Sequence, residues 1–209
     1  MGTRLVPSGR TATRLLQAAI GVVLVEGLLL QNPGVVVNAL LSLGVTFLPP
    51  VLARDWEVRL DTRLTLYIAV AVFLHSVGML GFYESVWWYD HLTHTLSATV
   101  VAGVGYATAK AFDEHSDAVH FPGSFLALYV LLFTLALGVF WEVLEFGARL
   151  LATAVGMDPI LFQYGIDDTL LDLVFNTAGA VLVALFGSGA LRPLVESLTT
   201  RFDRSFGER

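Results

Sequence analysis

The sequence predicts an all-α fold, a polytopic membrane helix bundle of about six transmembrane helices, on the grounds of composition and hydropathy. Hydrophobic residues make up 56% of the 209 residues and charged residues only 14%, and the mean hydropathy is +0.72. Soluble domains carry roughly 25% charged residues, so the charges are too few to cover a surface that faces water. The apolar residues also form runs of about 20, the length that a helix needs to cross a bilayer.

Six such runs follow one another along the chain, separated by polar or turn-forming segments. They lie at about 14–31, 34–52, 64–83, 89–112, 123–150 and 168–187. Asn32-Pro33-Gly34 predicts a tight turn between the first two runs, and Pro49-Pro50 predicts the end of the second. We therefore expect one helix-bundle domain over residues 1–209, with a polar tail from 191 that lies at or outside the membrane surface.

Basic residues are distributed very unevenly between the loops. If the N-terminus is cytoplasmic, eleven of the twelve fall on the cytoplasmic side: Arg4, Arg10, Arg14, Arg54, Arg59, Arg63, Lys110, Arg192, Arg201, Arg204 and Arg209. Only Arg149 falls on the other side. Because Lys and Arg accumulate in cytoplasmic loops, we expect a multi-pass protein of the cell (plasma) membrane with both termini in the cytoplasm.

Acidic residues are divided equally, so the outer side is strongly negative. Nine of the eighteen fall there: Glu26, Glu84, Asp90, Glu142, Glu145, Asp158, Asp167, Asp168 and Asp172. The formal charge is then +2 on the cytoplasmic side and −8 on the outer side. Such a surface concentrates cations. The net charge of −6 argues against nucleic acid as a partner, and the absence of cysteine excludes disulfides, thiolate metal sites and cysteine nucleophiles.

Ionisable residues gather in the outer halves of the last three spans, where each costs roughly 2.5–3.5 kcal/mol if left unpaired. Asp90 and His94 share one face of the fourth span, four residues apart, with His91 about 100° round the helix. On the fifth span, Glu142, Glu145 and Arg149 follow at helical spacing. On the sixth, one stripe holds Asp168, Asp172 and Asn176. These nine residues form the predicted binding site, to which His75, Glu84 and Glu26 could add.

Each feature also has a purely structural interpretation. Asp90, and Asp167 or Asp168, could cap their helices or interact with the helix dipole. Glu145 and Arg149 have the spacing of an ion pair. His75 is alone in its span, which is typical of a hydrogen-bonded packing residue. We interpret Gly138 and Gly179 as helix-packing positions, and Trp87, Trp88 and Tyr89 as an interfacial aromatic belt.

The same residues carry a family resemblance. "DHLTH" at 90–94, "EVLE" at 142–145 and "DLVFNTAGA" at 172–180 resemble three signatures of VanZ-like membrane proteins, in the same order. The YjdF-like inner-membrane proteins are also similar, with a Glu-x-x-Glu pair and an acidic entry to the last helix, here 165–172. His91 stands where many relatives have Lys or Arg, and no arginine before the sixth span matches the VanZ-like pattern. The resemblance covers 64–187, and the first two spans only by hydropathy; it implies a six-span fold and a site, but no reaction.

Three functions stay open at this point. The first is a binding protein whose outer pocket holds a cation or a lipid or envelope headgroup, with membrane lipids as further partners. The second is an intramembrane metal-dependent enzyme that acts on a lipid-linked substrate, and the third is a small proton- or cation-coupled transporter. If the cofactor is a divalent metal ion, its predicted ligands are Asp90, His94, Glu142 and Asp172, since carboxylates and imidazole suit such ions. We expect these four to converge between the last three spans, with shared protons or pairing with Arg149 as alternatives to a metal.

Overall fold

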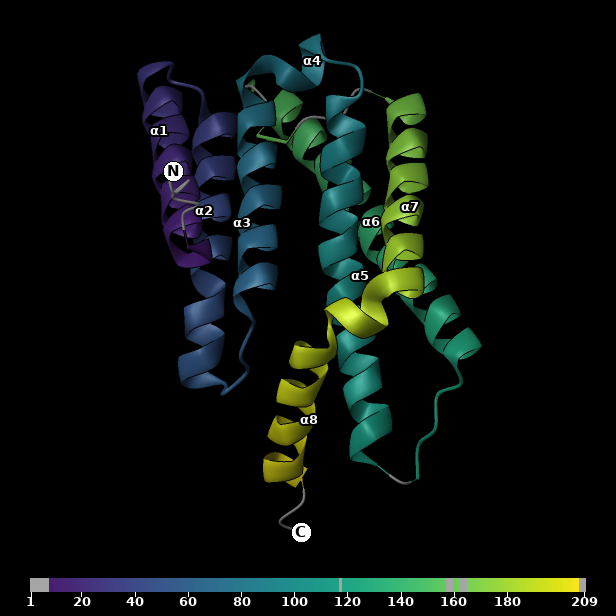
Figure 1. Ribbon diagram of the computed structural model, residues 1–209. Helices are drawn as coiled ribbons and strands as arrows, with labels where there is room; N and C mark the ends of the chain where they lie inside the picture. The colour runs from purple at the N-terminus through teal and green to yellow at the C-terminus, as the bar shows by residue number, and fades with distance from the viewer. Residues whose placement is uncertain (1–7, 117, 157–159, 162–164, 207–209) are drawn as a thin grey trace, which may run out of the picture.

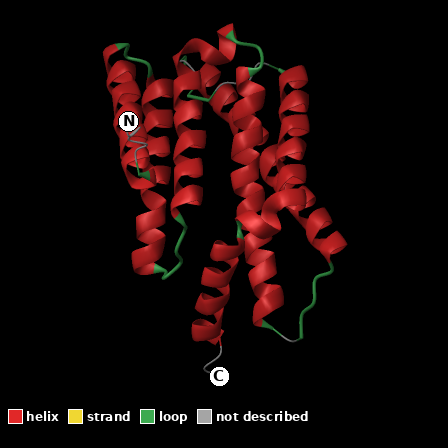
Figure 2. Cartoon of the chain, in the orientation of Figure 1, coloured by secondary structure: helices red, strands yellow, loops and turns green. Residues whose placement is uncertain are grey.

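Every regular element is a helix in the computed structural model, which describes residues 8–116, 118–156, 160–161 and 165–206 (Figures 1 and 2). The all-α fold is therefore confirmed. In chain order the elements are α1 (Gly9–Leu29), α2 (Pro33–Asp55), α3 (Thr62–Val77), the π-helical turn η1 (Gly78–Phe82), α4 (Tyr83–Ser85), α5 (Tyr89–His115), α6 (Gly123–Val155), α7 (Ile166–Ala190) and α8 (Arg192–Phe206).

Within this described part of the chain, five helical segments are long and apolar enough to cross a membrane: α1, α2, the segment from α3 to α4, α6 and α7. The predicted fourth span, α5, has 27 residues but is less apolar than these five. It packs against α3, α6, α7 and α8, so its polar side chains can face protein instead of lipid. That position accommodates the costly ionisable residues that the sequence places on this helix.

The long helices form two groups of three that lie side by side (Figure 1). Helices α1, α2 and α3 pack around Ile20, Val23, Val35 and Ala39. Helices α5, α6 and α7 pack against one another, and α3 contacts α5 to join the groups. Several large apolar side chains are about two-thirds exposed, among them Phe186 and Leu185 of α7 and Val22 of α1. Such exposure is expected for surfaces that face lipid.

Two boundaries differ from the prediction. The predicted end of the second span at Pro49-Pro50 is wrong, because α2 continues to Asp55. Pro50 leaves the Thr46 carbonyl without its helical donor, and α1 supplies a replacement: Gln17 Nε2 lies 3.5 Å from Thr46 O and 3.1 Å from its Oγ1. The third span is also interrupted after Val77, where Gly81 in η1 has a φ of +102° that glycine adopts without penalty.

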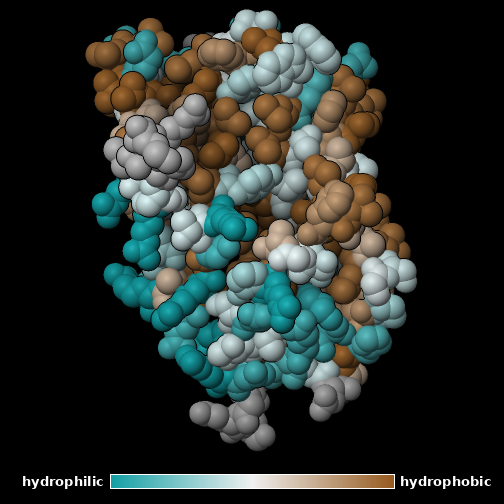
Figure 3. All heavy atoms as spheres, in the orientation of Figure 1, coloured by the Kyte–Doolittle hydropathy of each residue, from teal (hydrophilic) through white to brown (hydrophobic). Residues whose placement is uncertain are grey.

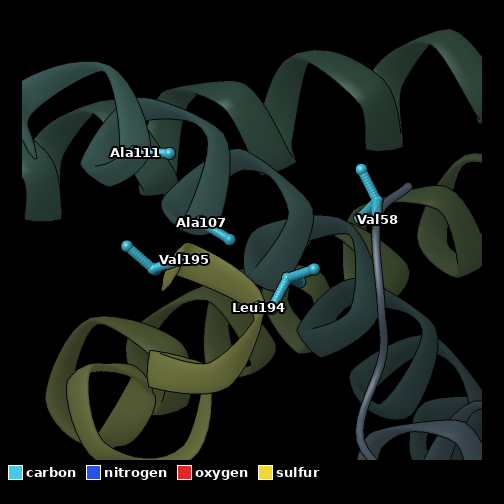
Figure 4. Packing of buried hydrophobic residues seen from close by; sticks show 5 residues of the cluster. All are labelled: Val58, Ala107, Ala111, Leu194 and Val195. Carbon is cyan, nitrogen blue, oxygen red and sulfur yellow. The ribbon is translucent and has the colours of Figure 1, made fainter. Parts of the chain in front are cut away.

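The end of the molecule at which α2 and α5 finish is hydrophilic, whereas hydrophobic residues cover most of the rest of the face in Figure 3. Here the tail forms a helix, α8, rather than an irregular segment. Its Leu194 and Val195 pack on Ala107 and Ala111 of α5 and on Val58 (Figure 4). The tail is therefore docked on the bundle by its apolar face. Arg4 and Arg209 of the predicted basic side, and Asp158 of the acidic side, lie outside the described residues.

Candidate functional site

Two glycines near the middle of α6 and α7 allow α5, α6 and α7 to pack closely. A Cβ at Gly179 of α7 would lie 2.7 Å from both the Ala98 Cβ and the Thr95 carbonyl of α5. A Cβ at Gly138 of α6 would lie 2.7 Å from the Asn176 amide of α7. Both glycines are therefore helix-packing positions, as predicted, and they set the spacing at which the polar side chains meet.

The four predicted metal ligands come together at this place. His94, Glu142 and Asp172 each offer a ligand atom, and these atoms all lie within 4.8 Å of one another. His94 Nε2 is 3.6 Å from Oδ1 of Asp90 and also 3.6 Å from Oδ1 of Asp172. Those contacts are too long for hydrogen bonds. They are close to the spacing of about 3.4 Å between two ligands of a tetrahedral ion with bonds of about 2.1 Å.

Two carboxylates of this cluster are buried without complete hydrogen bonding. Glu142 is only 4% exposed and Asp172 only 2%. Thr169 donates a hydrogen bond of 2.8 Å to Oε2 of Glu142, but Oε1 of Glu142 and Oδ1 of Asp172 have no hydrogen-bond partner among the described residues. A buried polar atom without a partner costs about 1–3 kcal/mol, and more if it is charged. Both oxygens therefore remain available to a cation.

The cluster borders a cavity of about 30 Å³. Asp90, His94 and Asp172 of the cluster line it. The lining also includes residues from the other group of helices: Asn38 of α2, His75 of α3, Met79 of η1 and Tyr83 of α4. The predicted pocket between three spans is thus also lined by α2, α3 and the interrupted turn. A cavity needs about 10–15 Å³ to hold one water molecule, so this one has room for about two.

His75 is held on both sides of its ring, as its interpretation as a packing residue predicts. Nε2 lies 3.1 Å from Oδ1 of Asn38, and Nδ1 lies 2.6 Å from the hydroxyl of Tyr83. The Asn38 amide also donates to the carbonyls of Gly34 and Ile160. This chain of hydrogen bonds fixes the wall of the cavity that faces the acids.

The remaining residues of the predicted site lie in different surroundings. Asp168 lines the cavity with Glu145, whereas Asn176 is buried beside His94. The ring of His91 stacks on Phe175 of α7, with centroids 4.4 Å apart, and its Nδ1 is buried without a partner among the described residues. All three side chains therefore stay close to the cluster.

The predicted ion pair between Glu145 and Arg149 is not formed. Glu145 is 8% exposed and accepts a hydrogen bond of 2.9 Å from the indole of Trp141. The Arg149 guanidinium lies over the ring of Phe146, 5.5 Å from its centroid. Glu145 therefore pairs with Trp141, four residues earlier, and not with Arg149, four residues later.

Three other interpretations need correction. Asp90 and Asp168 are not N-caps, because Trp88 and Gly165 occupy those positions; both acids lie in the first turn, where the helix dipole favours negative charge. Tyr89 is buried and donates to the Leu74 carbonyl, so only Trp87 and Trp88 are exposed as an aromatic belt requires. Glu26 and Glu84 are exposed and do not line the cavity.

Sequence reasoning missed Asn38, Met79, Tyr83 and Trp141, which also line the cavity. Asn38 could have been noticed as an amide in an otherwise apolar span. The position of Tyr83 depends on the turn η1. In the sequence, the pair of glycines at 78 and 81 is what indicates this turn. Met79 and Trp141 resemble many other apolar residues of the chain, and nothing in the local sequence distinguishes them.

Comparison with known proteins agrees with this architecture. An uncharacterized protein of Thermotoga maritima is 32% identical over 145 residues, which are 66% of this chain and 68% of the relative. No solved structure matches the chain. The model of a family described as "Predicted membrane protein (DUF2238)" matches residues 12–193, so the match includes α1 and α2 as well as the helices of the cluster. The chain therefore belongs to this family of membrane proteins, DUF2238.

Proposed function

We propose that this protein binds a divalent metal ion between α5, α6 and α7, with His94, Glu142 and Asp172 as ligands and Asp90 beside them. The observation that carries the proposal is the group of three ligand atoms within 4.8 Å, two of whose residues have a buried carboxylate oxygen without a hydrogen-bond partner among the described residues. A cation satisfies both oxygens at once. It also offsets the repulsion between neighbouring carboxylates in a medium of low dielectric constant.

The ligand types favour zinc or manganese over calcium or magnesium. Calcium and magnesium are bound by oxygen ligands, whereas imidazole together with carboxylates suits zinc and other transition metals. Three protein ligands of this kind leave a fourth position of a zinc ion for water. The cavity of about 30 Å³ has room for such a water beside the ion.

The size of the cavity argues against a lipid headgroup as its ligand, since about 30 Å³ has room for only about two water molecules at about 10–15 Å³ each. The burial pattern argues against transport. Among the described residues, the buried carboxylates with an unpartnered oxygen are those of Glu142 and Asp172, both at the same end of the bundle. A carrier has to pass its cargo to both sides, but the buried carboxylate that the described residues show in the opposite half, Asp113, is already paired with Lys110.

We also propose how the protein is oriented in the membrane and to which other families it is related. We place both termini in the cytoplasm and the metal site toward the outer face of the plasma membrane, because Arg54, Arg59, Arg201 and Arg204 border one hydrophilic cleft at the opposite end. We also infer kinship with VanZ-like and YjdF-like proteins. The segments that carry the resemblance, 90–94, 142–145 and 172–180, are the ones whose side chains meet at this site.

Metal titration of the purified protein tests the proposal. Protein in detergent is stripped with a chelator and dialysed against zinc or manganese, and bound metal is counted by elemental analysis. We expect the wild type to bind metal stoichiometrically and Glu142→Gln and Asp172→Asn to lose it. Asp167→Asn is the matched control, because Asp167 is an exposed carboxylate in the first turn of the same helix. Retention by Asp172→Asn, or loss in the control alone, contradicts the proposal.

A further inference from the structure

The cluster contains two groups of possible ligands, and Asp172 belongs to both. His94, Glu142 and Asp172 form the group described above, and Asp90, His91 and Asp172 form the other. In each group the ligand atoms lie within 4.8 Å of one another. Asp172, the residue that the two groups share, is only 2% exposed. A carboxylate has two oxygens, so one buried aspartate can serve two ions at once.

The buried atoms without hydrogen-bond partners are divided between these groups. Among the described residues they are Nδ1 of His91, Oε1 of Glu142 and Oδ1 of Asp172. Glu142 belongs to one group, His91 to the other, and Asp172 to both. A single ion at His94, Glu142 and Asp172 would satisfy two of the three and leave His91 without a partner.

Packing holds His91 where a ligand would be needed. Its ring stacks on Phe175 of α7 with an interplanar angle of 6°, and Trp87 lies edge-on to it with centroids 6.2 Å apart. His91 is therefore fixed between α5 and α7 by its ring faces and edge, and not by hydrogen bonds at Nδ1. A histidine fixed by its ring faces keeps its nitrogens free for a metal.

We infer that the site is dinuclear, with Asp172 bridging one divalent ion held by His94 and Glu142 and a second held by Asp90 and His91. Ions that share a carboxylate in such sites lie about 3.5–4 Å apart. Each ion then has one imidazole and two carboxylate ligands, and all three unpartnered atoms are used. This inference rests on the proposed function, since it adds a second ion to the same cluster.

Manganese titration with electron paramagnetic resonance tests the number of metal ions bound per chain. The stripped full-length protein is dialysed against Mn²⁺, and bound metal per chain is measured together with the spectrum. We expect two ions per wild-type chain and the multiline signal of an exchange-coupled Mn²⁺ pair. His91→Ala is expected to bind one ion with the six-line signal of isolated Mn²⁺, and Asp172→Asn to bind none tightly. His120→Ala, which changes an exposed histidine just before α6, is expected to bind two.

The outcomes separate this inference from the proposed function. One ion per wild-type chain, without exchange coupling, overturns the dinuclear site and leaves the metal-binding function standing. No bound ion in the wild type overturns both. Two ions in His91→Ala contradict the assignment of His91 as a ligand. The wild-type spectrum decides the question even if a variant fails to fold.

Discussion

Glu142 is oriented by one neighbour, Thr169 of α7, whose hydroxyl donates to Oε2 and leaves Oε1 facing the cluster. Hydrogen bonds of this kind fix the orientation of metal ligands, and their removal weakens metal affinity by about 10–100-fold. We expect Thr169→Val to weaken zinc or manganese binding by that factor while the protein stays folded. Equilibrium dialysis over a range of metal concentrations measures the change.

Thr177→Val is the matched control, because the Thr177 hydroxyl donates to the Leu173 carbonyl of its own helix. Equal metal affinity in the wild type and in Thr169→Val would show that the threonine does not orient Glu142. A loss of the same size in both threonine variants would assign the effect to α7 as a whole.

Part of the site could be predicted residue by residue, from the spacing of polar side chains along each helix. This spacing places Asp90 with His94, and Asp172 with Asn176, on common faces, and these residues do lie at one cluster. It could not decide the partner of Glu145, since Trp141 and Arg149 are both four residues away and the side-chain direction selects between them. Nor could it find Asn38, whose place at the cavity depends on how α2 packs.

At the scale of helices, contact between α5 and α7 positions the cluster, and Gly179 permits that contact. A Cβ there meets the Thr95 carbonyl and the Ala98 Cβ at 2.7 Å. We expect Gly179→Ala to lower the stability of the folded protein by about 1–3 kcal/mol, the usual cost of overpacking, and to weaken metal binding as α5 and α7 separate. Unfolding in detergent followed by circular dichroism measures the stability.

Gly44→Ala serves as the comparison, since a Cβ at Gly44 in α2 meets nothing within 4 Å. Alanine is more favourable than glycine inside a helix by about 0.5–1 kcal/mol, so Gly44→Ala should be as stable as the wild type or slightly more stable. If Gly179→Ala behaves in the same way, close packing at this position does not hold the cluster together.

The sequence predicted the number and order of the long helices better than their interruptions. Hydropathy reports the length of an apolar run, and all six runs are helices. It does not report the break at η1, which depends on a left-handed glycine, or the passage of α2 through Pro50, which depends on Gln17 of another helix. The apolar spacing of Leu194, Val195, Leu198 and Phe202 was a signal for α8.

At the scale of the whole molecule, the two ends differ in charge, and this difference predicts the orientation in the membrane. The chain has no cysteine, so single cysteines can report which side each end faces. Trp56 and Trp87 are matched positions, because they are 63% and 81% exposed at opposite ends of the bundle. In intact cells a membrane-impermeant maleimide should label Trp87→Cys and leave Trp56→Cys unlabelled until the cells are permeabilised. The reverse pattern would place the metal site in the cytoplasm.

The proposed metal site requires direct contact between a metal ion and side chains of α5, α6 and α7. X-ray absorption at the zinc edge of the stripped and zinc-loaded protein measures that contact. We predict a first shell of nitrogen and oxygen at about 2.0–2.2 Å, with the outer-shell scattering of imidazole, and its loss in Asp172→Asn. A shell of oxygen alone without imidazole scattering, unchanged in Asp172→Asn, would contradict the proposed site.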